Sequence, residues 1–229
     1  MVGPMEPRSR KISVSPGVDV SSLWCVPRGY DRERGLVLAH GAGNDMHSEF
    51  LSFVHTTLAE RGALTVKFNF PYTERGARSP DRPPVLIETW RAVARAVRED
   101  PELMPRRLVL GGKSMGGRIA SMIAADGEPC AGLVLLGYPL HPAGQPGRLR
   151  VDHLARIRMP MLFVQGTRDP LCDMALLEDA LAGLEAPVTL HRIEEGDHSF
   201  AVPKRLGRAP QEIREEIAGV VERWLSQLG

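Results

Sequence analysis

The segment from Leu108 to Ala125 constrains the fold of this chain more than any other part of its 229 residues. An apolar run from Leu108 to Leu110 ends in two glycines, and a lysine and a single serine, Ser114, follow. After Met115 come two more glycines and then a stretch of small apolar residues that is typical of a helix. The pattern predicts a strand, a turn too tight for most side chains, and a helix, with Ser114 at the apex of the turn.

Residues 112–116 fit the G-x-S-x-G pattern that holds a nucleophilic serine on a sharp strand-to-helix turn. The glycines have a physical reason, because a Cβ two residues before or after the serine would collide with the neighbouring strand and helix. We expect a strained backbone at Ser114, costing about 1–3 kcal/mol. This strain would expose the serine Oγ at the edge of the sheet, near the positive end of a helix dipole.

Two other interpretations of these residues compete with a nucleophile. Ser114 could be the ordinary N-cap of the following helix. Alternatively, Gly112-Lys113-Ser114 could end a phosphate-binding loop, but that pattern requires a glycine five residues before Gly112, where Arg107 stands. The rest of the chain must therefore decide between a cap and a nucleophile.

Elsewhere the chain alternates apolar runs with stretches of helical periodicity, and these patterns predict one α/β domain over residues 12–229. Residues 1–11 are polar and predict a disordered lead-in. We expect an edge hairpin (12–14 and 22–26), six further strands (35–40, 63–70, 108–110, 132–137, 160–165 and 188–193) and five helices (48–62, 86–97, 118–125, 176–184 and 210–228). Strands that alternate with helices predict a mostly parallel, doubly wound sheet flanked by helices, and the last helix covers one face. The connection at 140–158 is too short for a large cap domain, which favours an open, shallow pocket.

Three chemically suited side chains follow the ends of separate predicted strands. In such a sheet, ligands bind beyond the carboxyl ends of the strands, where Ser114, Asp169 and His198 would lie. A nucleophilic serine needs a base and an orienting acid, and the chain order Ser, Asp, His is the one expected after this type of turn. We predict Ser114 as nucleophile, Asp169 as acid and His198 as base, although Asp169 could instead cap the next helix and His198 could be a surface histidine. Asp173 is the alternative acid, and Asp197 is discounted because it is adjacent to His198.

The negatively charged oxygen of a tetrahedral intermediate requires backbone N–H donors. One candidate is the N–H of Met115, at the start of the predicted helix. The other should come from the glycine-rich turn at residues 40–43, and we predict the N–H of Ala42. Alternatively, residues 40–43 form an ordinary tight turn with no role toward the oxyanion.

Several residues after the predicted strands are candidates for the walls of a substrate pocket: His40, Asn69, Tyr72 and Tyr138. His40 could instead support its loop, and the other side chains could simply fill loops. Lys113 is adjacent to the serine, but we expect it to point away from the reacting atoms.

Composition excludes several classes of partner. With 29 basic and 28 acidic residues, the formal charge is +1, which gives no basis for binding nucleic acid or an anionic membrane. No run approaches the roughly 20 apolar residues of a membrane span. The three cysteines are widely spaced, which suits a reducing compartment, and we expect a cytoplasmic protein. No metal or cofactor motif is present, so neither is expected, and nothing in the sequence sets the oligomeric state.

The chain resembles a small α/β-hydrolase from about residue 12 onward. Within that superfamily it is similar to the compact dienelactone-hydrolase-like proteins, and closest to the branch related to testis-expressed protein thirty and to a subunit of a chromatin-acetylating complex. The residues that carry this resemblance are His40-Gly41-Ala42-Gly43, Asn69-Phe70-Pro71-Tyr72 followed by Pro80-Asp81, Gly112-Lys113-Ser114-Met115-Gly116-Gly117, Gln165-Gly166-Thr167-Arg168-Asp169 and Gly196-Asp197-His198.

The resemblance implies an α/β-hydrolase fold in which Ser114, Asp169 and His198 are nucleophile, acid and base. True dienelactone hydrolases carry a cysteine nucleophile, so their substrate does not transfer to a chain with Ser114. We expect hydrolysis of a small-molecule carboxylic ester or thioester through an acyl-enzyme. The alternative is a non-catalytic protein-interaction module on the same fold, because the resembling branch includes a complex subunit and a fold does not fix a function.

Overall fold

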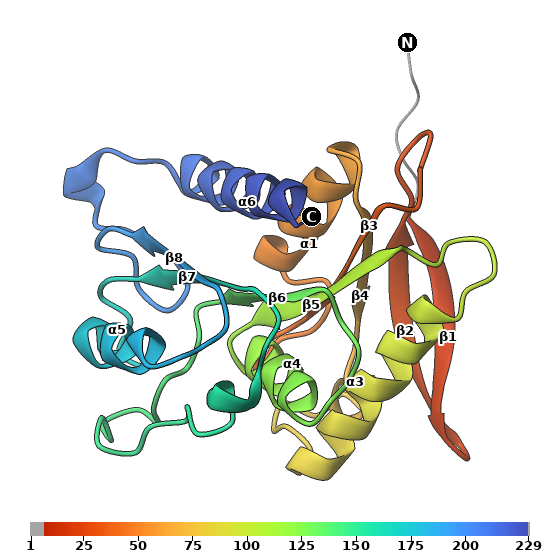
Figure 1. The fold of residues 1–229 in the computed structure, drawn as a ribbon, viewed down its shortest axis with the longest axis horizontal. Helices are drawn as coiled ribbons and strands as arrows, with labels where there is room; N and C mark the ends of the chain where they lie inside the picture. The colour runs from red at the N-terminus through yellow and green to blue at the C-terminus, as the bar shows by residue number, and fades with distance from the viewer. Residues whose placement is uncertain (1–6, 229) are drawn as a thin grey trace.

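The computed structural model describes residues 7–228, which contain an eight-stranded sheet in the order β1-β2-β4-β3-β5-β6-β7-β8 (Figure 1). The strands are β1 (Arg8–Ser15), β2 (Val18–Cys25), β3 (Arg34–Ala39), β4 (Leu64–Phe68), β5 (Arg107–Lys113), β6 (Gly132–Leu136), β7 (Met161–Gly166) and β8 (Val188–Ile193). The hairpin β1–β2 is antiparallel, β2 joins β4 antiparallel, and β3 to β8 are parallel. The predicted edge hairpin and mostly parallel sheet are confirmed.

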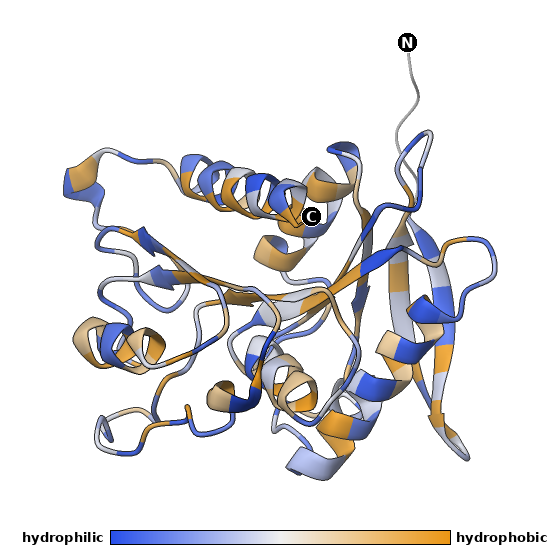
Figure 2. Ribbon diagram, viewed as in Figure 1, coloured by the Kyte–Doolittle hydropathy of each residue, from blue (hydrophilic) through white to orange (hydrophobic). Residues whose placement is uncertain are grey.

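Helices cover both faces of the sheet, as the alternating pattern predicted (Figure 1). The helices α1 (Glu49–Glu60) and α6 (Pro210–Gln227) pack on one face. The helices α3 (Pro83–Arg98), α4 (Met115–Ala125) and α5 (Met174–Ala182) pack on the other. In Figure 2 the central strands are largely apolar, whereas the helices alternate between apolar and polar residues. Burial on both faces explains why the central strands are continuous apolar runs.

Two local features differ from the sequence-based expectations. The first strand begins at Arg8, so residues 8–11 belong to the hairpin and the predicted disordered lead-in over 1–11 is wrong there. Arg10 stabilises this extension, because its guanidinium lies 4.4 Å from the centroid of the Trp24 ring and pairs with Asp100. Residues 1–6 of the predicted lead-in lie outside the described residues. A short helix, α2 (Pro71–Glu74), replaces the expected loop after β4.

No large cap domain lies over the sheet. The connection between β6 and β7 contains a single short 3₁₀ helix, η1 (Leu154–Arg156), among the described residues. Another short 3₁₀ helix, η2 (Lys204–Leu206), precedes α6. Within residues 7–228, none of the helices combines the length and the apolar character that a membrane span requires.

Candidate active site

Ser114 lies in the turn between β5 and α4 with an unusual backbone conformation. Its φ is +52° and its ψ is −118°, a combination that non-glycine residues rarely adopt. A Cβ on Gly112 would lie 2.3 Å from the carbonyl oxygen of Ala39, and a Cβ on Gly116 would lie 2.5 Å from the same atom. The two glycines therefore let the turn approach β3 closely. Ser114 occupies the cap position of α4, but its side chain makes no capping hydrogen bond.

The structure brings Ser114, His198 and Asp169 into one hydrogen-bonded chain. The Nδ1 of His198 is 2.7 Å from Oδ2 of Asp169, and its Nε2 is 2.8 Å from Oγ of Ser114. Because a carboxylate only accepts, Nδ1–H donates to Asp169, and Nε2 then accepts from the serine hydroxyl. The His198 side chain is 25% exposed, so the hydrogen-bonded chain of these three residues is accessible from solvent at the carboxyl edge of the sheet.

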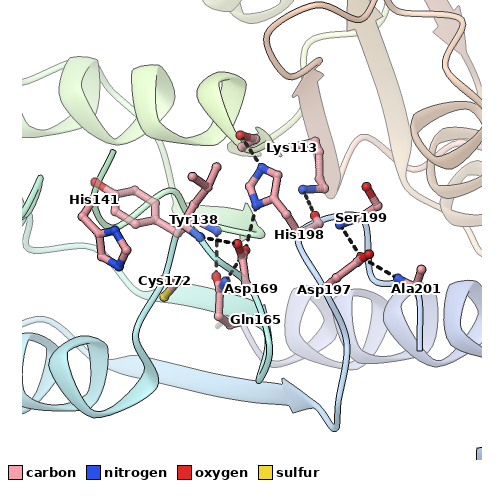
Figure 3. Close-up of polar contacts among 12 residues, drawn as sticks. Lys113, Tyr138, His141, Gln165, Asp169, Cys172, Asp197, His198, Ser199 and Ala201 are labelled. Carbon is pink, nitrogen blue, oxygen red and sulfur yellow. Dashed lines mark hydrogen bonds and ion pairs between the residues drawn. The ribbon is translucent and has the colours of Figure 1, made fainter. Parts of the chain in front are cut away.

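Asp169 is held by further donors that sequence reasoning did not identify. Its side chain is fully buried. Gln165 Nε2 donates to Oδ2 at 2.7 Å, and the backbone N–H of Leu171 donates to Oδ1 at 2.8 Å. The Oε1 of Gln165 in turn accepts from the N–H of Tyr138 at 2.8 Å, which connects the loops after β6 and β7 (Figure 3). The sequence signals for Gln165 are its polar side chain at the end of an apolar strand and its place in the motif Gln165-Gly166-Thr167-Arg168-Asp169.

The two other aspartates weighed as the acid have different roles. Asp173 caps α5, accepting from the N–H of Leu176 at 3.1 Å. Asp197 shapes the turn after His198, since its Oδ1 accepts from the backbone N–H groups of Ser199 and Ala201 at 2.7 and 2.9 Å (Figure 3). Neither carboxylate hydrogen-bonds to His198 in the structure.

Lys113 contacts the histidine loop rather than the serine hydroxyl. Its Nζ donates to the main-chain oxygen of His198 (Figure 3) and lies 5.0 Å from the centroid of the Phe200 ring. Burial lowers the pKa of Lys113 to about 8, and the negative charges of Asp169 and Asp197 oppose this shift. The ammonium therefore ties the end of β5 to the loop that carries the histidine.

The two predicted oxyanion donors belong to the start of α4 and to the turn after β3. Met115 begins α4, so its N–H has no carbonyl partner within the helix. A Cβ built on Gly41 would lie 3.4 Å from the Cβ of Ser114, so the residue that precedes Ala42 lies beside the serine. Ala42 is exposed, and its N–H donates to no other described backbone group. Their role toward a substrate stays a prediction.

The four predicted pocket residues are buried and support loops around Ser114. His40 donates from Nδ1 to the oxygen of Gly41 at 2.9 Å and accepts at Nε2 from the N–H of Phe70 at 3.3 Å. Burial lowers the pKa of His40, which favours this neutral form. Thus His40 fixes the turn that carries Ala42.

Asn69, Tyr72 and Tyr138 are also buried. Asn69 Oδ1 accepts from the N–H of Met46 at 2.9 Å, Tyr72 packs edge-on against the ring of His40, and Tyr138 donates from its hydroxyl to the oxygen of Arg150 at 2.7 Å. Direct contact of these residues with a substrate stays a prediction.

No group of three or more His, Cys, Asp or Glu side chains within the described part of the chain is placed to hold a metal ion.

Comparison with known proteins identifies the family. A model of the alpha/beta hydrolase domain matches residues 32–226. The chain belongs to the α/β-hydrolase family. The narrower resemblance to the branch of testis-expressed protein thirty stays a prediction.

Solved structures share the fold of this α/β-hydrolase over nearly its whole length. A dienelactone hydrolase from Anabaena variabilis is 21% identical with a TM-score of 0.76, and the match covers 98% of both chains. An alpha-beta serine hydrolase homologue from Coxiella burnetii is 20% identical with a TM-score of 0.73, covering 97% of this chain and 98% of that one. A serine hydrolase without a lid from Xanthomonas campestris is 25% identical with a TM-score of 0.71, covering 98% of this chain and 97% of that one.

Proposed function

We propose that this α/β-hydrolase cleaves a carboxylic ester or thioester through an acyl-enzyme on Ser114. The observation that carries the proposal is the continuous chain from Ser114 Oγ to His198 Nε2 at 2.8 Å and from His198 Nδ1 to Asp169 at 2.7 Å. A serine that only caps a helix needs neither this chain nor a strained backbone. Both features are what a base-activated nucleophile requires.

In the proposed reaction, His198 takes the proton of Ser114 as Oγ attacks the substrate carbonyl. Asp169 keeps the histidine in the tautomer with hydrogen on Nδ1 and stabilises its positive charge. The N–H groups of Met115 and Ala42 donate to the oxyanion. His198 then returns the proton to the leaving alcohol or thiol, and afterwards activates a water molecule that releases the acid.

The proposal is tested by labelling with a fluorophosphonate probe, which reacts with an activated serine hydroxyl as fluoride leaves. Mass spectrometry should locate the adduct on Ser114. The adduct should disappear in Ser114→Ala and His198→Ala. The exposed neighbour Ser199 provides a matched control, and Ser199→Ala should label as the wild type does.

A panel of p-nitrophenyl esters and acyl-CoA thioesters of different chain lengths then identifies the acyl group. Absence of labelling in a protein with a native circular dichroism spectrum would contradict the proposed chemistry. That result would favour the non-catalytic interaction module instead.

A further inference from the structure

Four arginines line a single cavity beside α4. The cavity has a volume of about 470 Å³, within the range of small-molecule sites. Its walls are α4 and the segment before and within η1, which lies beside α4 in Figure 1. The charged and polar lining consists of Arg118, Arg148, Arg150, Arg156, Asp152 and His153. Neither Ser114 nor His198 contributes to this lining, so the cavity is separate from the candidate active site.

Three of the four arginines in this cavity lack counterions among the described residues. Arg156 pairs with Asp126 at 3.0 Å, but Arg118, Arg148 and Arg150 form no ion pair with any described carboxylate. The Nε of Arg118 is buried and has no hydrogen-bond partner among residues 7–228. A buried donor without a partner costs about 1–3 kcal/mol. Such a group calls for an acceptor from outside the chain.

Nearby titratable groups do not neutralise the cluster. Burial and then the charge of Arg118 lower the pKa of Arg150. Burial, followed by Arg118 and Arg156, lowers the pKa of His153 to about 4, so this histidine is neutral near pH 7. Asp152 is the one carboxylate in the lining, and it is exposed. The cavity therefore carries a net positive charge.

The cavity wall is held in place by hydrogen bonds. The N–H of Arg150 donates to the oxygen of Leu140 at 2.8 Å, and the hydroxyl of Tyr138 donates to the oxygen of Arg150 at 2.7 Å. His153 Nε2 lies 2.7 Å from the hydroxyl of Ser121 on α4. These bonds fix the backbone of Arg150 and the ring of His153, so several arginines project from an ordered wall into one cavity, and this concentration of positive charge favours an anion as the missing partner.

We propose that this cavity binds the phosphate group of a phosphate monoester. A guanidinium group can donate two parallel hydrogen bonds to two oxygens of a phosphate. Three arginines that pair with no carboxylate of the protein offer more N–H donors than the two oxygens of a carboxylate ligand can accept, so a phosphate is the better match. The cavity also has room for an organic group attached to the phosphate. Arg118 follows Ser114 by one turn of α4, roughly 6 Å along the helix. The phosphate therefore belongs either to the ester substrate or to a separate phosphorylated ligand.

The binding test uses inorganic phosphate and the Ser114→Ala protein, so that its result does not depend on the proposed hydrolysis. Phosphate should raise the Tm more than sodium chloride at equal ionic strength. Calorimetric titration should give a Kd that becomes roughly 10- to 100-fold weaker in Arg118→Gln and Arg150→Gln. Arg95 lies on α3, outside this cavity, and Arg95→Gln is the control that removes one charge without weakening the Kd.

The Tm of each variant, measured without phosphate, shows whether weaker binding comes from a loss of the fold. It should not fall in Arg150→Gln, because the substitution relieves repulsion. A phosphate effect equal to that of chloride would overturn the proposal. Equal phosphate affinity in the Ser114→Ala protein with and without each cavity substitution would also overturn it.

A second measurement distinguishes the two sources of the phosphate. The rate of p-nitrophenolate release is compared for two p-nitrophenyl acyl esters, with and without a phosphate on the acyl chain. A preference of roughly 10- to 100-fold for the phosphorylated ester, lost in Arg150→Gln, assigns the phosphate to the substrate. Phosphate binding without such a preference assigns it to a separate ligand.

Discussion

At the scale of residues, the candidate site depends on how Asp169 is held. Three donors converge on this buried carboxylate: Gln165 Nε2, the N–H of Leu171 and Nδ1 of His198. Hydrogen bonds to a charged carboxylate are stronger than those to a neutral group. Two of these donors, on β7 and in the loop that follows it, orient the carboxylate without any contribution from His198.

We predict that Asp169→Asn lowers kcat by about 10⁴-fold, because an amide cannot enforce the histidine tautomer with hydrogen on Nδ1. The measurement is ester hydrolysis at saturating substrate, with circular dichroism to verify the fold. Asp173→Asn is the matched control, since that residue caps α5 and should leave kcat within about twofold of wild type. Equal losses in the two variants would exclude Asp169 as the orienting acid.

Lys113 should make stability depend on alkaline pH. Burial lowers its pKa to about 8 in the folded protein from the ordinary value of 10.5. Between these values the unfolded chain binds more protons than the folded one, so stability rises with pH. The contribution is complete above the unfolded pKa and is lost as the pH falls through about 8.

The prediction is that the free energy of unfolding of the wild type, relative to that of Lys113→Met, increases from pH 8 to pH 10.5. Urea denaturation of both proteins at several pH values measures this difference. A difference independent of pH would show that the Lys113 ammonium is well solvated.

Chain order was sufficient to predict Ser114, Asp169 and His198 as partners, because parallel strands deliver the ends of successive segments to one edge. The roles of Gln165 and Lys113 could not be predicted in this way. Each acts through a hydrogen bond between segments distant in sequence, Gln165 to Tyr138 and Lys113 to the backbone of His198. No local pattern specifies such contacts.

At the scale of elements, the turn between β5 and α4 is limited by its contact with β3. Gly116 lies in the first turn of α4, where alanine would ordinarily favour the helix. A Cβ there would nevertheless lie 2.5 Å from the oxygen of Ala39 and 2.7 Å from that of His40. These are backbone atoms of a buried strand end, so they cannot move aside cheaply.

We therefore expect Gly116→Ala to lower the free energy of unfolding by about 1–3 kcal/mol. Gly147→Ala is the control, because a Cβ there has no atom within 4 Å and the change should stay within about 0.5 kcal/mol. Urea denaturation of both variants decides the matter. A Gly116→Ala protein as stable as wild type would mean that α4 can shift away from β3.

The strands and helices with a clear hydrophobic pattern were predicted correctly, and these include the edge strand β8. Strands β3 to β7 are almost entirely buried, β6 is apolar throughout, and α6 has a strong helical periodicity. The early start of β1 was missed because Arg8 to Lys11 is polar. This strand lies at the sheet edge, where polar residues are tolerated. The short helix α2 was missed because its few residues follow a buried strand without a periodic pattern of their own.

At the scale of the whole molecule, the sheet separates two apolar clusters that share the same strands. In β3, Val37 and Ala39 belong to the cluster under α3 and α4, whereas Leu36 and Leu38 belong to the cluster under α1 and α6. Successive strand residues point to opposite faces, so neither cluster can lose its packing while the other keeps an intact strand. The chain should therefore unfold as one unit, in keeping with a single domain.

The three tryptophans allow this cooperativity to be measured on each face. Trp24 and Trp90 belong to the cluster under α3 and α4, and Trp224 belongs to the one under α1 and α6. Two variants are required, one retaining only Trp224 and one retaining only Trp90, with phenylalanine at the other tryptophan positions. In each variant the fluorescence midpoint in urea should coincide with the midpoint from far-ultraviolet circular dichroism. If Trp224 became exposed at a lower urea concentration than the loss of secondary structure, α6 would be detaching first, and the two faces would not form one cooperative unit.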